Sequence, residues 1–391
     1  SPDFPRTYWP DMRGSSTPTV ALVIFEGGAA TSLPEQMLRQ VREGIVLDRV
    51  AQARRIQALD PIVLVTDRED LARKAEALGA HIYFTQSHSF HFGLCLQAVI
   101  RHYELERVLY MGGGAAPLAS PMEIGRIVSL LQRAEALAAA NNYHSADVVA
   151  FTPAVRALSA PLPPLDNLLA QALVEAGLPY RPLPRSLGLN FDVDTPTDLM
   201  VLAVHPAVGR ATAAALKELE LNLEPVRRAA ELLLTPQADV LIFGRVGGAL
   251  FQYLDAVTQC RLRLFSEERG MKAMGRDLRG EVLSLVGFLV DEVGPAGFID
   301  RVARLAQAAF IDTRILWAHR RQTPSAADRF FSDLLVPDAI ADPFTRELTA
   351  AARAAAIPIL LGGHSLVAGG VWALVDAALR SKQELCAAPR S

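Results

Sequence analysis

Hydrophobic residues in the first half of the chain alternate between short β-branched runs and longer stretches with helical spacing. Strands are predicted over residues 20–25, 61–66, 81–85, 107–111 and 147–152. Helices are predicted over residues 39–59, 69–78, 93–103 and 121–140. Strands that alternate with helices pair in parallel through right-handed crossovers, so this half predicts a mostly parallel α/β sheet.

A second α/β series begins after a helical connection. Its predicted strands cover residues 239–243, 260–265, 309–316 and 357–361, with helices between them. The predicted parts are an arm over 1–18, rich in proline and polar residues, a domain over 19–204, a helical connection over 205–236 and a smaller α/β domain with a parallel sheet over 237–391. A length of 391 residues suits two hydrophobic cores.

Charge and composition narrow the classes of partner. The chain has 39 Lys and Arg against 42 Asp and Glu, so it lacks the basic surplus typical of proteins that bind nucleic acids or anionic membranes. No uninterrupted apolar run approaches the roughly 18 residues of a membrane span, and the first residues do not resemble a signal peptide. We therefore expect a soluble, cytoplasmic protein with small-molecule partners. Alanine-rich helices such as 211–221 suit packing within one subunit or between two subunits. The sequence is therefore compatible with both a monomer and a homo-oligomer.

Two glycine-rich segments follow predicted strands of the first half. They contain Gly27 and Gly28 after the first strand, and Gly112, Gly113 and Gly114 after the strand 107–111. Glycines let backbone N–H groups approach a phosphate without obstruction by side chains. These five residues are therefore candidates for binding the phosphates of a nucleotide, and Arg39 and Arg42 are the nearest cations.

In order, these segments resemble the nucleotidyltransferase family that includes molybdopterin guanylyltransferase, 2-phospholactate guanylyltransferase and the sugar-phosphate nucleotidyltransferases. Residues 108–118 match the position of the family's GDxPL loop, and residues 191–199 match its closing DIDTPEDL motif. The resemblance covers residues 18–204. It implies a Rossmann-like, GT-A-like fold, Mg²⁺ as cofactor, and transfer of a nucleotidyl group from an NTP to a small phosphorylated or carboxylated acceptor.

The same resemblance assigns roles to acidic residues and shows two departures. Asp192 and Asp194 lie in the closing motif and are candidates for metal binding and catalysis, since two hard carboxylates at alternate positions can face one side. A competing interpretation is that Asp194 or Thr195 caps the following helix. Ala115 stands where the family has a metal-binding aspartate, and the first loop lacks the usual Arg and Lys. The alternative is thus a degenerate binding or assembly module whose ligand site lies in the second half.

Polar residues also gather where strands of the second half end, which is where open α/β sheets bind ligands. The candidates for that ligand site are Arg245, Glu267, Arg269, Asp312, Arg314, His364 and Ser365. The segment around Ser365 invites comparison with a hydrolase nucleophile. Val367 stands where that motif needs glycine, and no histidine follows the serine, so the sequence argues against a serine hydrolase.

Overall fold

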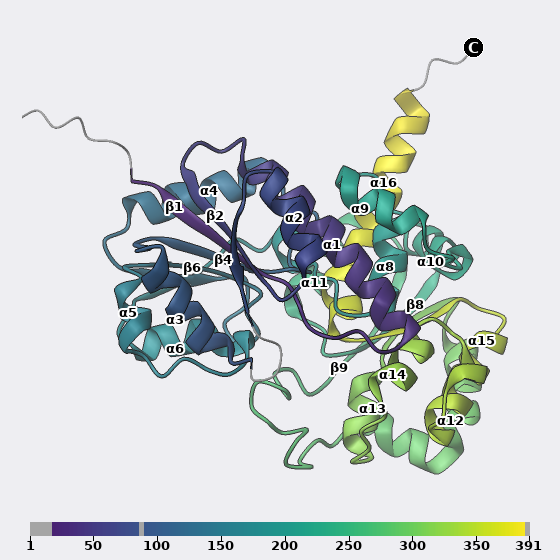
Figure 1. Ribbon diagram of the computed structural model, residues 1–391. Helices are drawn as coiled ribbons and strands as arrows, with labels where there is room; N and C mark the ends of the chain where they lie inside the picture. Colours follow the sequence, from purple (N-terminus) through teal and green to yellow (C-terminus); the bar gives the residue numbers. More distant parts are fainter. Residues whose placement is uncertain (1–17, 86–89, 388–391) are drawn as a thin grey trace, which may run out of the picture.

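A computed structural model describes residues 18–85 and 90–387, so nearly all of the predicted arm over 1–18 lies outside the described residues. The fold is α/β with two sheets (Figure 1). The first sheet has seven strands in the order β3-β2-β1-β4-β6-β5-β7. These strands are β1 (Val20–Phe25), β2 (Leu59–Thr66), β3 (His81–Phe84), β4 (Val108–Gly112), β5 (Leu137–Ala140), β6 (Val148–Thr152) and β7 (Tyr180–Pro182).

Pairing in the first sheet is mostly parallel, as the sequence predicts. Strands β1, β2, β3 and β4 are parallel neighbours, and β7 is parallel to β5. Strand β6 runs antiparallel to both β4 and β5. This reversal brings the start of β6 to the sheet edge where β4 ends.

The helix predicted over 121–140 is wrong in its second part. Helix α4 (Pro121–Arg133) ends early, and residues 137–140 form the buried strand β5 instead. Its Leu-Ala-Ala-Ala sequence has a high helix propensity, but hydrogen bonds to β6 and β7 on both sides override that local preference. Alanines fit here because both faces of this strand are covered.

Helices cover both faces of the first sheet (Figure 1). One face carries α1 (Leu33–Ala53), α2 (Glu69–Ala77) and α4, and the other carries α3 (Phe92–His102), α5 (Val155–Ser159) and α6 (Leu169–Glu175). Helix α1 begins earlier than the predicted residue 39, because Ser32 and Glu35 form a capping box and Pro34 occupies the first turn.

The second sheet has four parallel strands in the order β11-β10-β8-β9. They are β8 (Asp239–Gly244), β9 (Arg261–Ser266), β10 (Ala308–Asp312) and β11 (Ile359–Gly362). The strand predicted over 309–316 is too long. It stops at Asp312, whose carboxylate accepts a hydrogen bond from the Arg314 N–H and caps α13 (Thr313–His319).

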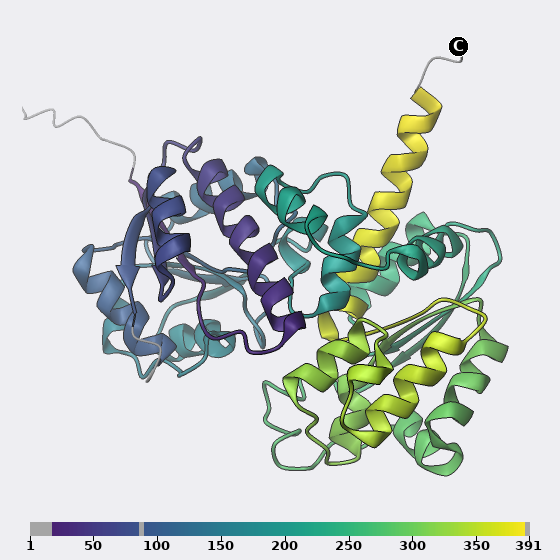
Figure 2. The same ribbon diagram turned by 45° about the vertical axis from the view of Figure 1, so that its right-hand side comes forward.

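The second sheet is also covered on both faces. Helices α12 (Leu285–Leu305), α13 and α15 (Pro343–Ala354) pack on one face. The other face carries α8 (Pro196–Ala203), α10 (Glu224–Leu233), α11 (Gly248–Val257) and α16 (Val371–Ala387), the last of which extends beyond the rest of the chain (Figure 2). The remaining helices include α7 (Leu187–Asn190), α9 (Arg210–Lys217) and α14 (Ala326–Asp333).

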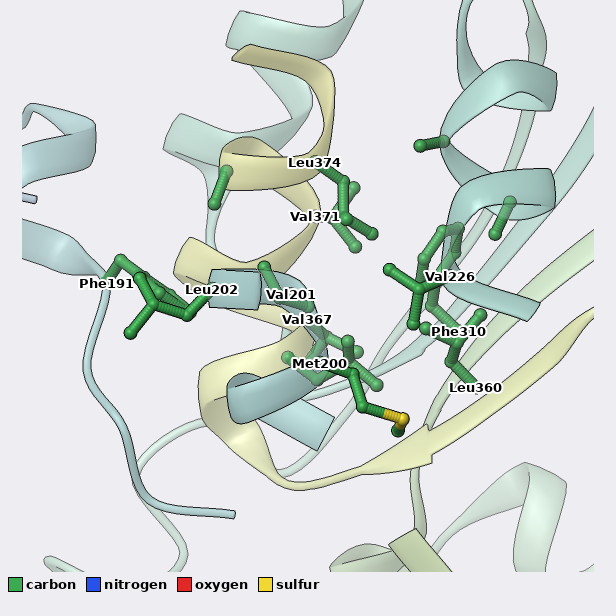
Figure 3. Close-up of a cluster of buried hydrophobic side chains, with 14 of the residues drawn as sticks. Phe191, Met200, Val201, Leu202, Val226, Phe310, Leu360, Val367, Val371 and Leu374 are labelled. Atoms are coloured by element: carbon green, nitrogen blue, oxygen red, sulfur yellow. The ribbon is translucent and has the colours of Figure 1, made fainter. Parts of the chain in front are cut away.

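One buried cluster joins the two halves. Figure 3 shows Met200, Val201 and Leu202 of α8 beside Val371 and Leu374 of α16, and the same cluster includes residues of α1 and of the second sheet. The helix that closes the first half therefore packs within the core of the second. The boundary at residue 204 stays a prediction about independent folding units. Within 18–85 and 90–387, no helix combines the length and apolar character needed to cross a membrane.

Candidate functional site

Two adjoining cavities lie where strands of the two sheets end. The first cavity, of about 610 Å³, is lined by segments that follow β1, β2 and β4. The second cavity, of about 1010 Å³, is lined by segments that follow the strands of the second sheet and by residues of the first half. Asp147, Asn167 and Asp194 line both cavities, so the two adjoin at these residues. Both volumes are in the range of small-molecule sites.

Parallel strands deliver acidic residues to the first cavity. Glu26 follows β1 and Asp67 follows β2, while Asp147 directly precedes the antiparallel strand β6. Because β6 starts where β4 ends, Asp147 reaches the same edge. Asp166, Asp192 and Asp194 are the other acidic residues of this lining. Among the described residues that line the first cavity, the one basic side chain is that of Arg42.

The first glycine segment faces a carboxylate in this structure. The Gly28 N–H donates to Asp67 Oδ1 at 3.1 Å and Oδ2 at 3.3 Å. A Cβ atom at Gly27 would overlap Asp67 Oδ1, so glycine at this position lets the carboxylate approach. The N–H that the sequence assigns to a phosphate is therefore occupied by Asp67.

Glycine in the second segment makes room for Glu26. A Cβ atom at Gly113 would overlap the Glu26 side chain. Glu26 is buried, and burial raises the pKa of its carboxyl, while Arg42 and Arg68 oppose that rise. The second glycine segment thus holds an acidic group against the cavity wall.

Gly113→Ala is therefore expected to destabilise the fold by about 1–3 kcal/mol, because the added methyl forces Glu26 and the loop apart. Urea unfolding measures the change. Gly125→Ala on α4 is the matched control, since its Cβ atom meets nothing within 4 Å and alanine favours the helix. Equal stability of the two variants would contradict the packing of Glu26 against Gly113.

Asp147 and Asp192 form a pair of half-buried carboxyls. Asp192 Oδ1 accepts a hydrogen bond from the Ala116 N–H at 3.2 Å, and the two carboxyls share a hydrogen bond. Burial raises the pKa of Asp192 to about 7, and Asp194 adds to the rise. Burial and the neighbouring Asp192 raise the pKa of Asp147 well above its usual value. Arg42 is the one basic side chain among the described residues that line this cavity, so little positive charge offsets the negative charge of the two carboxyls.

Arg42 and Asp194 lie at the junction of the cavities. Arg42 Nε and Nη2 donate to the Val193 carbonyl at 2.9 and 2.7 Å, and Nη2 lies 3.5 Å from Asp194 Oδ1. Arg39 lines neither cavity. Of the two arginines that the sequence suggests, the structure therefore places Arg42 at the site.

The cap of α8 is Thr195, with Asp198 in its capping box, and Asp194 remains exposed in the cavities. Asp198 Oδ2 accepts hydrogen bonds from the Thr195 N–H at 2.8 Å and from Ser365 Oγ at 2.7 Å. Burial raises the pKa of Asp198 to about 7, and the Ser365 hydrogen bond opposes the rise. Ser365 thus connects the two halves of the chain.

The donor set of the first cavity suits a magnesium ion that is bound together with phosphates. Among the residues described, no group of three or more His, Cys, Asp or Glu side chains is arranged to hold a metal. Mg²⁺ commonly takes one or two carboxylates and completes its shell with water and substrate phosphates. Asp147 and Asp192 offer such a pair, and the buried Ala115 beside Asp192 contributes no carboxylate.

Two buried ion pairs build the wall of the second cavity. Arg245 donates to Asp312 through Nε at 2.6 Å and Nη2 at 3.1 Å. Arg314 donates to Asp333 through Nη1 at 2.6 Å and Nη2 at 2.7 Å. Both aspartates are almost fully buried. Asp312 acts on the cavity through Arg245 and does not line it.

His364 and Arg269 line the second cavity, whereas Glu267 does not. The Glu267 carboxylate instead accepts a hydrogen bond from the Val286 N–H at 3.4 Å. Burial lowers the pKa of His364 to about 4, and Arg245 lowers it further, so its imidazole is neutral at neutral pH. Among the described residues, no hydrogen-bond partner lies at the buried His364 Nδ1.

Sequence reasoning did not single out several carboxyls that the fold brings to the site. Glu26, Asp67 and Asp147 each stand next to a strand, and Asp166 begins a short 3-10 helix, all positions where acidic residues are common. A lone aspartate before a strand carries no distinguishing signal. The antiparallel placement of β6 gives Asp147 its position, and that pairing is a tertiary property.

Neither a protein-family model nor a curated protein sequence matches the chain. Solved structures do show similarity. CMP:2-keto-3-deoxy-manno-octonic acid synthetase in complex with CTP is 13% identical over 51% of this chain and 100% of its own, with a TM-score of 0.35. A cytidylyltransferase from Leptospira borgpetersenii is 15% identical over 51% of this chain and 93% of its own, with a TM-score of 0.37.

A Mycobacterium tuberculosis protein, Rv0371C, in complex with manganese is 19% identical over 46% of this chain and 95% of its own, with a TM-score of 0.32. At these identities and TM-scores the likeness does not extend to substrate or reaction, which have to follow from this chain's own residues.

Proposed function

We propose that the first cavity binds a nucleoside triphosphate with Mg²⁺ and that the protein transfers the nucleotidyl group to a small acceptor. The observation that carries the proposal is the half-buried pair Asp147 and Asp192, at the edge where the central strands end and in the same cavity lining as the segment Gly112–Gly114. The pair would hold the metal ion, and a bound Mg²⁺ would neutralise charge on the phosphates.

Aromatic side chains in the lining of the first cavity suit a base. Phe25, Phe90 and Phe92 line this cavity, and the rings of Phe25 and Phe92 lie 5.1 Å apart. Aromatic rings stack on nucleobases without strong preference for one base. The cavity therefore combines an apolar wall for a base with carboxyls for a metal ion.

Charge makes the metal ion essential to this proposal. Six carboxyls and one arginine line the first cavity, so a bare triphosphate would be repelled. We expect nucleotide binding to require Mg²⁺ and to weaken as pH falls, because the pKa of Asp192 is raised to about 7, the pKa of Asp147 is raised well above its usual value, and a protonated carboxyl is a poor ligand.

In the proposed transfer, an oxygen of the acceptor attacks the α-phosphorus of the nucleotide. The new P–O bond forms while the bond from the α-phosphorus to the bridging oxygen breaks, and pyrophosphate leaves with the electron pair. A phosphate or carboxylate oxygen of the acceptor has no proton to lose, so this step needs no general base. Arg42, near the junction, is placed to offset negative charge that develops there.

A binding module without turnover is the second candidate, and Ala115 is the observation that favours it. Ala115 is buried beside Asp192 and supplies no metal ligand, and Asp67 occupies the Gly28 N–H. This candidate predicts nucleotide binding without release of pyrophosphate from any acceptor mixture.

Isothermal titration of the full chain with each of the four NTPs, with and without Mg²⁺, tests the proposal. Binding that requires Mg²⁺, followed by release of pyrophosphate with an acceptor, is the expected result. Binding without turnover would favour the module, and no binding of any NTP would overturn both candidates.

Ala115→Asp is expected to tighten Mg²⁺-dependent nucleotide binding about tenfold, equal to about 1.4 kcal/mol, because it adds a carboxylate beside Asp192. Titration calorimetry measures the change. Ala29→Asp adds the same charge at an exposed position of the first cavity and is the control. Equal effects of the two variants would indicate that the new carboxylate acts only through overall charge.

A further inference from the structure

Positive charge gathers in the second cavity, although the whole chain carries a formal net charge of −3. Seven lysine and arginine residues line this cavity against three aspartates. The proposed chemistry of the first cavity uses none of these seven cations. Their concentration in one place is therefore a feature of the fold and not of the composition.

Four of the seven cations are available to a ligand. Arg245 and Arg314 are held by buried aspartates, and Arg279 pairs with Glu281. Among the described residues, the other four take part in no ion pair. They are Arg269, Lys272, Arg321 and Arg329.

These cations come from separate parts of the second half. Arg269 and Lys272 lie in the segment after β9, Arg321 follows α13, and Arg329 lies on α14. Convergence of cations from three segments on one cavity has an electrostatic cost, because like charges repel. Burial lowers the pKa of Lys272, and the cations Arg245, Arg314 and Arg329 lower it further against the influence of Asp194.

The paired arginines give the wall fixed geometry. The bidentate contacts orient the guanidinium groups of Arg245 and Arg314, and the Arg314 guanidinium also lies 5.2 Å from the centre of the Trp317 ring. The neutral His364, with its buried Nδ1, lies in the same wall. These paired groups fix the shape of the wall, and the four cations outside the ion pairs are the ones available to phosphate oxygens.

We propose that the second cavity binds a small molecule through a phosphate group, and that this molecule is the acceptor. The role of this molecule as acceptor rests on the proposed nucleotidyl transfer, whereas the binding of a phosphate group does not. Asp147, Asn167 and Asp194 join the two cavities, so a molecule held by Lys272 and Arg329 lies beside the nucleotide. The cations neutralise the acceptor's charge, which would otherwise oppose its approach to a triphosphate.

Titration of the full chain with inorganic phosphate and with 3-phosphoglycerate, in low salt and without nucleotide, tests the site. The double variant K272M/R329M is expected to bind both probes at least tenfold more weakly. Arg261→Met removes an exposed arginine from β9, outside the cavity, and should leave both affinities unchanged. Malonate serves as a carboxylate probe, and tighter binding of malonate than of phosphate would overturn the assignment of a phosphate group.

Nucleotide titrations of the same variants separate this proposal from the proposed function. Unchanged Mg²⁺-dependent NTP binding by K272M/R329M supports a separate acceptor site. Loss of NTP binding in that variant, with competition between phosphate and NTP, would assign the cations to the nucleotide and overturn the acceptor site. Phosphate binding without binding of any NTP would keep the anion site and overturn nucleotidyl transfer. Wild-type protein that binds neither phosphate probe would overturn the anion site.

Discussion

Asp192→Asn is expected to weaken Mg²⁺-dependent nucleotide binding by roughly 100-fold, about 2.7 kcal/mol, and at the same time to stabilise the fold above pH 7. Binding is lost because an amide is a poor replacement for a carboxylate ligand of Mg²⁺. Stability is gained because the folded state holds this carboxyl partly out of water and beside Asp147 and Asp194, which costs free energy when Asp192 is ionised.

The sign of the pH effect follows from proton binding. The pKa of Asp192 is about 7 in the folded protein, against about 3.9 in an unfolded chain. Between these values the folded state binds more protons, so the free energy of unfolding falls as pH rises from about 4 to about 7, and it stays low above pH 7. Asparagine does not titrate, and the variant should be more stable at pH 8 by roughly 1–3 kcal/mol, since each pKa unit corresponds to about 1.4 kcal/mol.

Urea unfolding at pH 5 and pH 8, with titration calorimetry for the nucleotide, measures both effects. Asp300→Asn, at an exposed position of α12, removes one carboxyl from the surface and is the control. A variant that binds nucleotide as well as the wild type would remove Asp192 from the proposed metal site. A variant that is less stable than the wild type at pH 8 would contradict the electrostatic description of the carboxyl pair.

Asp312→Ala is expected to destabilise the fold by about 3–5 kcal/mol, because it leaves the buried Arg245 guanidinium without its partner. Loss of the cap of α13 adds to this effect. Urea unfolding measures the change. Arg261→Ala breaks the ion pair with Asp239, in which Arg261 is largely exposed, and is expected to cost at most about 1 kcal/mol.

The double variant R245M/D312L distinguishes a lost partner from lost packing. Replacement of a buried ion pair by apolar side chains of similar size is often neutral or stabilising, so the double variant should recover most of the lost stability. If Asp312→Ala were no more destabilising than Arg261→Ala, the Arg245 and Asp312 pair would not contribute to the fold as described.

The sequence by itself determined the fold class and most of the strands. The β-branched runs that became β1, β2, β4 and β8 are buried between helices on both faces, so hydrophobic pattern alone identifies them. The sequence also pointed to the glycine segments and Asp192, which line the first cavity. These residues belong to motifs that are continuous along the chain, so they can be recognised without the structure.

Tertiary structure decided what depends on distant neighbours. Residues 137–140 became the strand β5 because β6 and β7 pair with them, although alanine favours a helix. Asp147 faces Asp192 because β6 runs antiparallel to β4, and Asp333 is buried because Arg314 lies against it. The junction of the two cavities likewise joins residues from both halves of the chain. Local sequence encodes local preference, whereas pairing, burial and charge compensation arise only when distant segments meet.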